Sequence, residues 1–157
     1  MIKIELTPAE ILLAAQAGVM RQVENLKRRE GQNTHGYDER NPWQIHIEGC
    51  CGEMAVAKYL GRYWKGKGKR GEADVDDMDV RTRPFHGAEL ILHKSDPSSR
   101  VVWHVTGVNG IYMIHGWILG HAGQQEEFWS DKYNNGRPAY FVPFEELNDP
   151  VAFKMSM

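Results

Sequence analysis

The sequence predicts an α/β fold in which a mixed central β-sheet is flanked by helices. Two helical segments fill the N-terminal part, residues 7–61, and short alternating segments typical of strands fill residues 72–143. The chain has 157 residues, of which 41% are hydrophobic and 25% charged, a composition typical of a globular protein and not of a disordered or fibrous one. We therefore expect a single domain over 1–157 whose core requires no disulfide or structural metal.

The charge balance and the positions of the cysteines indicate which partners and which cellular compartment to expect. Nineteen basic and twenty-one acidic residues give a net charge of −2, so any binding to a polyanion requires a local basic patch. Cys50 and Cys51 are adjacent, which suits neither a loop-closing disulfide nor a tetrahedral metal site, and a reduced chain is the simpler expectation. The first twenty residues lack the charge pattern of a signal peptide and the length of a membrane span. We expect a cytoplasmic protein without a membrane partner, and a homo-oligomer remains open.

The first helix is predicted over residues 8–29. Thr7 and Glu10 form a capping box around Pro8, which stands at the first helical position. Apolar residues then recur at spacings of three and four and predict the buried stripe of this helix: Ile11, Leu12, Ala15, Val19, Val23 and Leu26. Residues 31–41 are polar and glycine-bearing, so they are predicted to be a loop.

A second helix is predicted from Pro42 to its C-cap at Gly61. The small residues at 49–52 lower helix propensity but allow another backbone to approach closely. Glu53 shares a helix face with Val56 and Leu60, so its carboxylate is expected to point toward the core side.

The segment after this helix is basic and then acidic. Residues 62–71 carry five positive charges and three glycines, and residues 72–79 carry five negative charges. Two short strands, 73–75 and 78–82, are predicted around a tight turn at Asp76 and Asp77. The basic residues are consistent with a solvated loop or with a phosphate-binding loop, and the candidates for nucleic-acid contact are Lys65, Lys67, Lys69 and Arg70.

The remaining elements follow from alternation and turn residues. Strands are predicted at 89–93, 101–107, 111–119 and 138–142, a short helix at 124–130 and a helical turn at 144–147, around one central sheet. Trp103 and Trp117 lie on apolar strands and are predicted to be in the core. The seven histidines show no spacing typical of zinc ligands, and no phosphate-binding glycine loop is present.

One group of residues carries candidate chemistry. Asp79 and Arg81 stand two residues apart on a strand and therefore leave the same face, and the hairpin is expected to bring Asp74 beside Asp79. Two neighbouring carboxylates favour a divalent cation between them, and their hard oxygen ligands suit Mg²⁺ or Mn²⁺. Glu53 would lie in the outer shell of that ion, and Arg81 would supply positive charge to a phosphodiester. The alternatives are a solvated acidic turn and an ordinary ion pair between Asp79 and Arg81.

The segments GCCGEMAVAKYLG and EADVDDMDVRTR resemble the core of the PD-(D/E)XK nuclease-like superfamily, especially its small phage-encoded members. The resemblance covers residues 49–107 and implies a restriction-endonuclease-like core with a metal-dependent activity on DNA phosphodiester bonds. By this resemblance Glu53, Asp74, Asp79 and Arg81 are catalytic, the three acidic residues bind Mg²⁺ or Mn²⁺, and DNA is the partner.

The chain departs from this family at its basic residue, which is usually lysine and is here Arg81. Arginine holds its proton too firmly to act as a base. The alternative function is therefore a catalytically lapsed nuclease-like fold that acts as a non-enzymatic binding or inhibitory protein with a protein partner. A structural protein of a virion is a third hypothesis.

Overall fold

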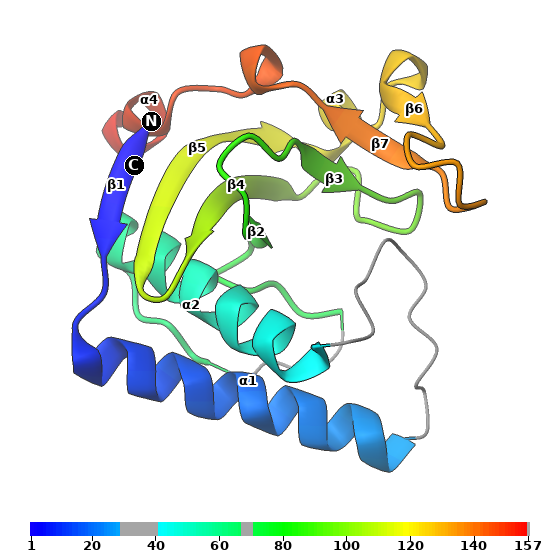
Figure 1. Ribbon diagram of the computed structural model, residues 1–157. Helices are drawn as coiled ribbons and strands as arrows, with labels where there is room; N and C mark the ends of the chain where they lie inside the picture. Colours follow the sequence, from blue (N-terminus) through cyan, green and yellow to red (C-terminus); the bar gives the residue numbers. More distant parts are fainter. Residues whose placement is uncertain (29–40, 67–70, 157) are drawn as a thin grey trace.

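The computed structural model describes residues 1–28, 41–66 and 71–156, which form two helices packed on a four-stranded sheet and a second, three-stranded sheet (Figure 1). The four-stranded sheet has the order β1 (Ile2–Glu5), β5 (Ile111–Leu119), β4 (Val101–Val108), β2 (Asp79–Arg83). The three-stranded sheet has the order β3 (Leu90–Leu92), β7 (Ala139–Val142), β6 (Trp129–Ser130). β2 runs parallel to β4 and the other paired strands are antiparallel, so the predicted mixed sheet flanked by helices is confirmed.

The two predicted N-terminal helices are confirmed as α1 (Pro8–Arg28) and α2 (Pro42–Leu60). The capping box is formed: the Thr7 amide donates to Glu10 Oε2 at 2.6 Å, and the Glu10 amide donates to Thr7 Oγ1 at 3.3 Å. α2 ends at Gly61, which has the left-handed φ of 66° that favours glycine. The end of the predicted first helix and the predicted loop fall mostly outside the described residues.

The predicted buried stripe of α1 is confirmed for Ile11, which packs against the core, and is wrong for three other residues. Leu12, Val19 and Leu26 are 60%, 37% and 59% exposed, whereas Ala14 is buried and Gln22 is only 6% exposed. A Cβ at Gly18 would lie 2.6 Å from the Cα of Ile47, so α1 lies against α2 through small residues. Close approach of the two helices therefore selects the small and polar face of α1 as its inner face.

α2 packs in turn on the four-stranded sheet. A Cβ at Gly52 would lie 1.9 Å from Thr82 Oγ1, so the small residues of α2 admit β2 at close range, as predicted. Val80 and Trp103 belong to the core cluster that contains the buried face of α2. Because successive side chains of a strand leave opposite faces, Asp79 and Arg81 point away from α2.

Several other predictions are confirmed with small changes and some are wrong. Strands β3, β4, β5 and β7 match their predictions, and so does the helical turn at Phe144–Glu146. The described residues form two sheets and not one, and residues 73–75 form only an isolated bridge between Val75 and Met78. The segment predicted as a helix at 124–130 is a 3-10 turn, Glu126–Phe128, followed by β6 and preceded by α3 (Gly120–Gly123).

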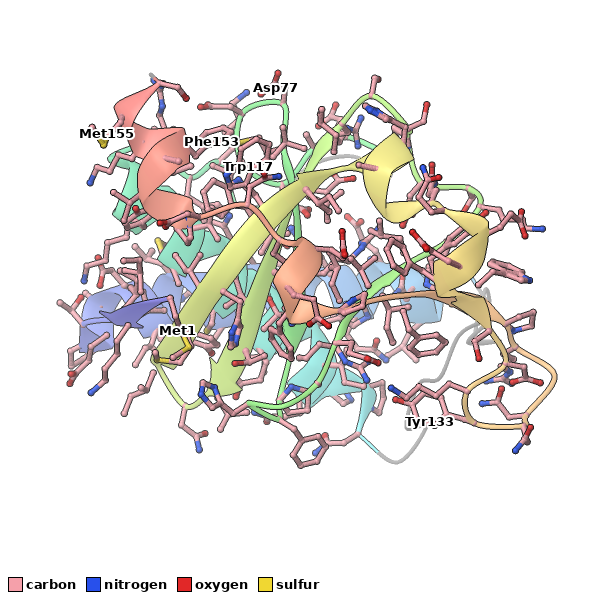
Figure 2. The ribbon with its side chains drawn as sticks, turned by 90° about the horizontal axis from the view of Figure 1, so that it is seen from above. Met1, Asp77, Trp117, Tyr133, Phe153 and Met155 are labelled. Atoms are coloured by element: carbon pink, nitrogen blue, oxygen red, sulfur yellow. The ribbon has the colours of Figure 1, made fainter. Side chains whose placement is uncertain are left out.

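The structure also has two terminal elements that the pattern did not predict, β1 and α4 (Pro150–Met155). Phe153 of α4 packs edge to face on Trp117, with ring centroids 5.1 Å apart, and on Trp103 at 5.0 Å (Figure 2). Trp103 is completely buried, as predicted, and Trp117 is partly buried against the same cluster. Across the described parts of the chain, no helix combines the length and apolarity needed to span a membrane.

Candidate functional site

Glu53 lies between α1 and α2, on the α2 side of the sheet, and is 3% exposed. Arg21 of α1 binds it in a bidentate ion pair, with Nη1 to Oε1 at 2.5 Å and Nη2 to Oε2 at 2.8 Å. The indole Nε1 of Trp64 also donates to Oε2 at 3.2 Å. Burial raises the pKa of Glu53 to about 7 although Arg21 and Trp64 act in the opposite direction. The expectation that Glu53 faces inward is confirmed.

Asp74 lies at the outer edge of β2, the edge strand of its sheet. Its Oδ2 accepts the Val80 amide at 2.8 Å, and its own amide donates to the Met78 carbonyl at 2.9 Å. The Asp74 carboxylate therefore accepts a hydrogen bond from a backbone N–H that faces away from the neighbouring strand, at the open edge of the sheet. The charge of Asp74 contributes to raising the pKa of both Glu53 and Asp79, so its carboxylate acts on groups on both sides of the sheet.

Asp79 begins β2 and points to the face opposite α2. It is 6% exposed, and its Oδ1 accepts Nη1 of Arg100 at 3.0 Å. Burial raises the pKa of Asp79, the nearby charge of Asp74 adds to this effect, and Arg100 opposes it. The effect of the Asp74 charge on Asp79 is consistent with the expected proximity of the two carboxylates.

Arg81 follows Asp79 on the same face of β2, but its ion-pair partner is Asp96. Nη2 of Arg81 donates to Asp96 Oδ1 at 2.9 Å, and Asp96 Oδ2 accepts the His93 amide. Arg81 still lies close enough to Asp79 to lower its pKa. Both side chains are therefore held by the segment between β3 and β4, which supplies Asp96 and Arg100.

Two glycines of the basic segment, residues 62–71, accept hydrogen bonds from the arginines that bind the carboxylates. Nη2 of Arg21 donates to the Gly66 carbonyl at 3.2 Å, and Nη2 of Arg100 donates to the Gly71 carbonyl at 3.3 Å. Lys65 is exposed next to the first of these contacts. The other basic residues predicted to contact nucleic acid lie outside the described residues: Lys67, Lys69 and Arg70.

Sequence reasoning missed Arg21, Trp64 and Arg100. None of these three residues was among the candidate site residues. One signal was present, because an inward-facing glutamate requires a buried partner and arginine is the usual one. The pattern did not say which of the chain's arginines that partner is.

The residues that could hold a divalent cation are Asp74 and Asp79. Their carboxylate oxygens are the hard ligands of Mg²⁺ and Mn²⁺, and Mg²⁺ is commonly bound through one or two carboxylates with water and phosphate oxygens. Both oxygens of Glu53 already accept hydrogen bonds, which is consistent with an outer-shell position. Within residues 1–28, 41–66 and 71–156, no three His, Cys, Asp or Glu side chains are grouped closely enough to hold a metal ion.

Comparison of the chain with protein-family profiles, with curated proteins and with solved structures found no match.

Proposed function

We propose that the chain is a Mg²⁺- or Mn²⁺-dependent DNA phosphodiester hydrolase of phage or mobile-element type, with a restriction-endonuclease-like core and a site in the host cytoplasm. The observation that carries this proposal is the position of Asp74, whose charge acts on Asp79 on one side and on Glu53 on the other. By the sequence resemblance, these three residues correspond to the acidic residues of the family motif.

Asp74 and Asp79 would hold the cation at the edge of β2, where repulsion between their carboxylates favours a positive charge. The ion would supply a bound water of lowered pKa and charge neutralisation of the phosphodiester. Arg81, held by Asp96 on the same strand face, presents a fixed positive charge to a phosphate oxygen. Arg21 and Trp64 fix the position of Glu53.

The basic segment would position the DNA. Gly66 and Gly71 of this segment accept hydrogen bonds from Arg21 and Arg100, the arginines that bind Glu53 and Asp79. Phosphate contacts would come from Lys65, Lys67, Lys69 and Arg70. Replacing all four by glutamine is expected to weaken DNA binding and to flatten its dependence on salt. An unchanged salt slope would show that the segment takes no part in binding.

The test of the enzyme is cleavage of single- and double-stranded DNA in Mg²⁺ or Mn²⁺, against a chelator. Asp79→Asn is expected to abolish cleavage, Arg81→Ala to slow it about 10²- to 10³-fold, and Arg81→Lys to retain it. Glu145→Gln, an exposed change on the helical turn after β7, is the matched control and should cleave as the wild type does. Metal-independent cleavage, or full activity of Asp79→Asn, would contradict the proposal.

A second function, a lapsed nuclease that binds without cleaving, is favoured by one observation. Glu53 and Asp79 each already have an arginine as counter-charge, Arg21 and Arg100. In that case the wild type binds DNA or a protein partner equally well with metal and with chelator and never cleaves DNA. A gain of metal-dependent cleavage in Arg81→Lys would identify the lapsed enzyme directly.

A further inference from the structure

The outward face of α1 carries five exposed apolar side chains, called here the outer stripe. The fractions exposed range from 37% to 60% among Leu12, Leu13, Val19, Met20 and Leu26. The inner face, against α2, is formed by Ala14, Gly18 and Gln22 and by the ion-paired Arg21. α1 lies along one side of the molecule, with α2 and the sheet on its inner side and no described element beyond it (Figure 1). This distribution is the reverse of that expected for a surface helix.

Three residues of the outer stripe also belong to a row of residues with the spacing of a coiled-coil seam. Leu12, Gln16, Val19, Val23 and Leu26 follow one another at intervals of four, three, four and three residues, as in two heptads. Leu13 and Met20 flank this seam. A polar residue at one such position, here Gln16, is a known device for fixing the register of paired helices.

The seam matches a second copy of itself in the antiparallel direction. Leu12 and Leu26 are each seven residues from Val19, so a two-fold axis at Val19 places Leu12 of one copy against Leu26 of the other. A two-fold interface requires this self-complementarity, in which each position meets its symmetric counterpart.

The area is compatible with a reversible dimer. The outer stripe presents roughly 400–500 Å² of apolar residue surface, within the range of the largest patch on a typical monomer. Two copies would bury about 900 Å² from these residues alone, near the low end of specific interfaces before the polar rim is added. The net charge of −2 gives no electrostatic attraction to an anionic membrane, which disfavours a lipid surface as the occupant.

We infer that the outer stripe of α1 is the interface of a homodimer in which two α1 helices pair antiparallel about Val19. This inference is independent of the proposed nuclease activity, because the outer stripe lies on the face of α1 opposite Arg21 and the candidate site. The dimer is expected to be reversible, with a Kd in the micromolar range.

Sedimentation of the full chain across the micromolar range tests the interface. The wild type is expected to pass from monomer to dimer as concentration rises. Val19→Glu places two carboxylates on the two-fold axis and is expected to weaken the dimer by about 100-fold. Phe85→Glu changes another exposed apolar residue, 74% exposed and outside α1, and should leave the dimer unchanged. A wild type that stays monomeric, or a dimer that survives Val19→Glu, would overturn the inference.

Cross-linking tests the direction of pairing with variants that keep the stripe largely apolar. With a mild oxidant, two thiols become one disulfide, so Val19→Cys is expected to form a linked dimer, as is a mixture of Leu12→Cys with Leu26→Cys. Leu12→Cys alone should not link. The native Cys50 and Cys51 are 0% and 2% exposed and do not compete. Linking by Leu12→Cys alone, with none in the mixture, would contradict the antiparallel arrangement.

Discussion

The two faces of the four-stranded sheet differ in the titratable groups that they hold: the face covered by α2 carries Glu53, and the other face carries Asp79 and a pair of histidines. On the face covered by α2, Glu53 is a buried carboxyl bound to Arg21. On the other face, the rings of His104 and His115 stack with centroids 5.1 Å apart, and Phe144 packs against both. His104 donates through one ring nitrogen to the Ala88 carbonyl at 2.8 Å, and His115 is hydrogen-bonded to Thr106 Oγ1 at 2.7 Å.

Burial acts on Glu53 and on the histidines in opposite directions because it always disfavours the charged form. It raises the pKa of Glu53 to about 7 and lowers the pKa of His104 and of His115 to about 4, with the neighbouring imidazoles adding to the shift at His115. The folded state therefore binds the Glu53 proton more tightly than the unfolded state does, and stability falls as pH rises from about 4.5 to about 7. The histidines have the opposite effect: stability falls as pH drops from about 6.5 to about 4.

The largest expected effect comes from removing the partner of Glu53. Arg21→Met leaves a buried carboxylate unpaired and is expected to lower the free energy of unfolding by about 3–5 kcal/mol near pH 8. Near pH 5.5 the loss should be smaller, because a protonated Glu53 has no charge to leave unpaired. Urea unfolding at the two pH values measures both. Arg62→Met, which breaks an exposed pair with Asp76, is the control and should cost at most about 1 kcal/mol. Equal losses of Arg21→Met at both pH values would show that Glu53 does not titrate in this window.

The histidine face is tested by His104→Gln. In the wild type, charging this buried imidazole is expected to cost up to about 3 kcal/mol of stability between pH 6.5 and pH 4. The variant should be less stable by about 1 kcal/mol near pH 7, where a buried hydrogen bond is altered, and should lose less on acidification. Thermal or urea unfolding across this range gives the slope directly, and NMR titration of His104 gives its pKa. A His104 that titrates near pH 6.5 in the folded protein would remove the contrast between the faces.

Gly52→Ala is expected to change the packing only on the face of the four-stranded sheet that α2 covers. The new methyl would meet Thr82 Oγ1, and we expect a loss of about 1–3 kcal/mol. Gly49→Ala is the matched control, because a Cβ there has nothing within 4 Å and should stabilise the helix by about 0.5–1 kcal/mol. Adding Thr82→Ala should recover part of the loss in Gly52→Ala, while the titration of His104 stays unchanged. Equal effects of the two glycine substitutions would show that α2 does not lie this close to β2.

The smallest expected effect lies outside both clusters. Thr7→Ala removes the oxygen that accepts the Glu10 amide at the start of α1 and should cost about 1 kcal/mol. The loss should be the same at pH 6 and pH 8, which provides a baseline for the two pH-dependent clusters, and Thr7→Ser should keep the wild-type stability. A loss of stability in Thr7→Ser as large as in Thr7→Ala would show that the cap contributes little.

Much of the secondary structure could be predicted because its signals are local. Proline, threonine and glutamate at the start of α1, and Gly61 at the end of α2, fix helix boundaries within one turn. Alternation predicted β4 and β5. The buried face of α1 was predicted wrongly because it depends on what packs against it. Gly18 lies inside because α2 approaches closely there, and Arg21 lies inside because Glu53 is opposite it. β1 and α4 were missed because such short segments carry little periodicity.

For the candidate site, local patterns were enough to predict that Asp79 and Arg81 share a strand face and that Glu53 faces inward. Local patterns could not predict that Glu53 and Asp79 lie on opposite sides of the sheet with Asp74 at its edge. Nor could they predict that Arg21, Arg100 and Asp96 are the charged partners. The physical reason is range. Caps, alternation and helix phase act over a few residues, whereas a buried charge is paired by whichever distant segment folds against it.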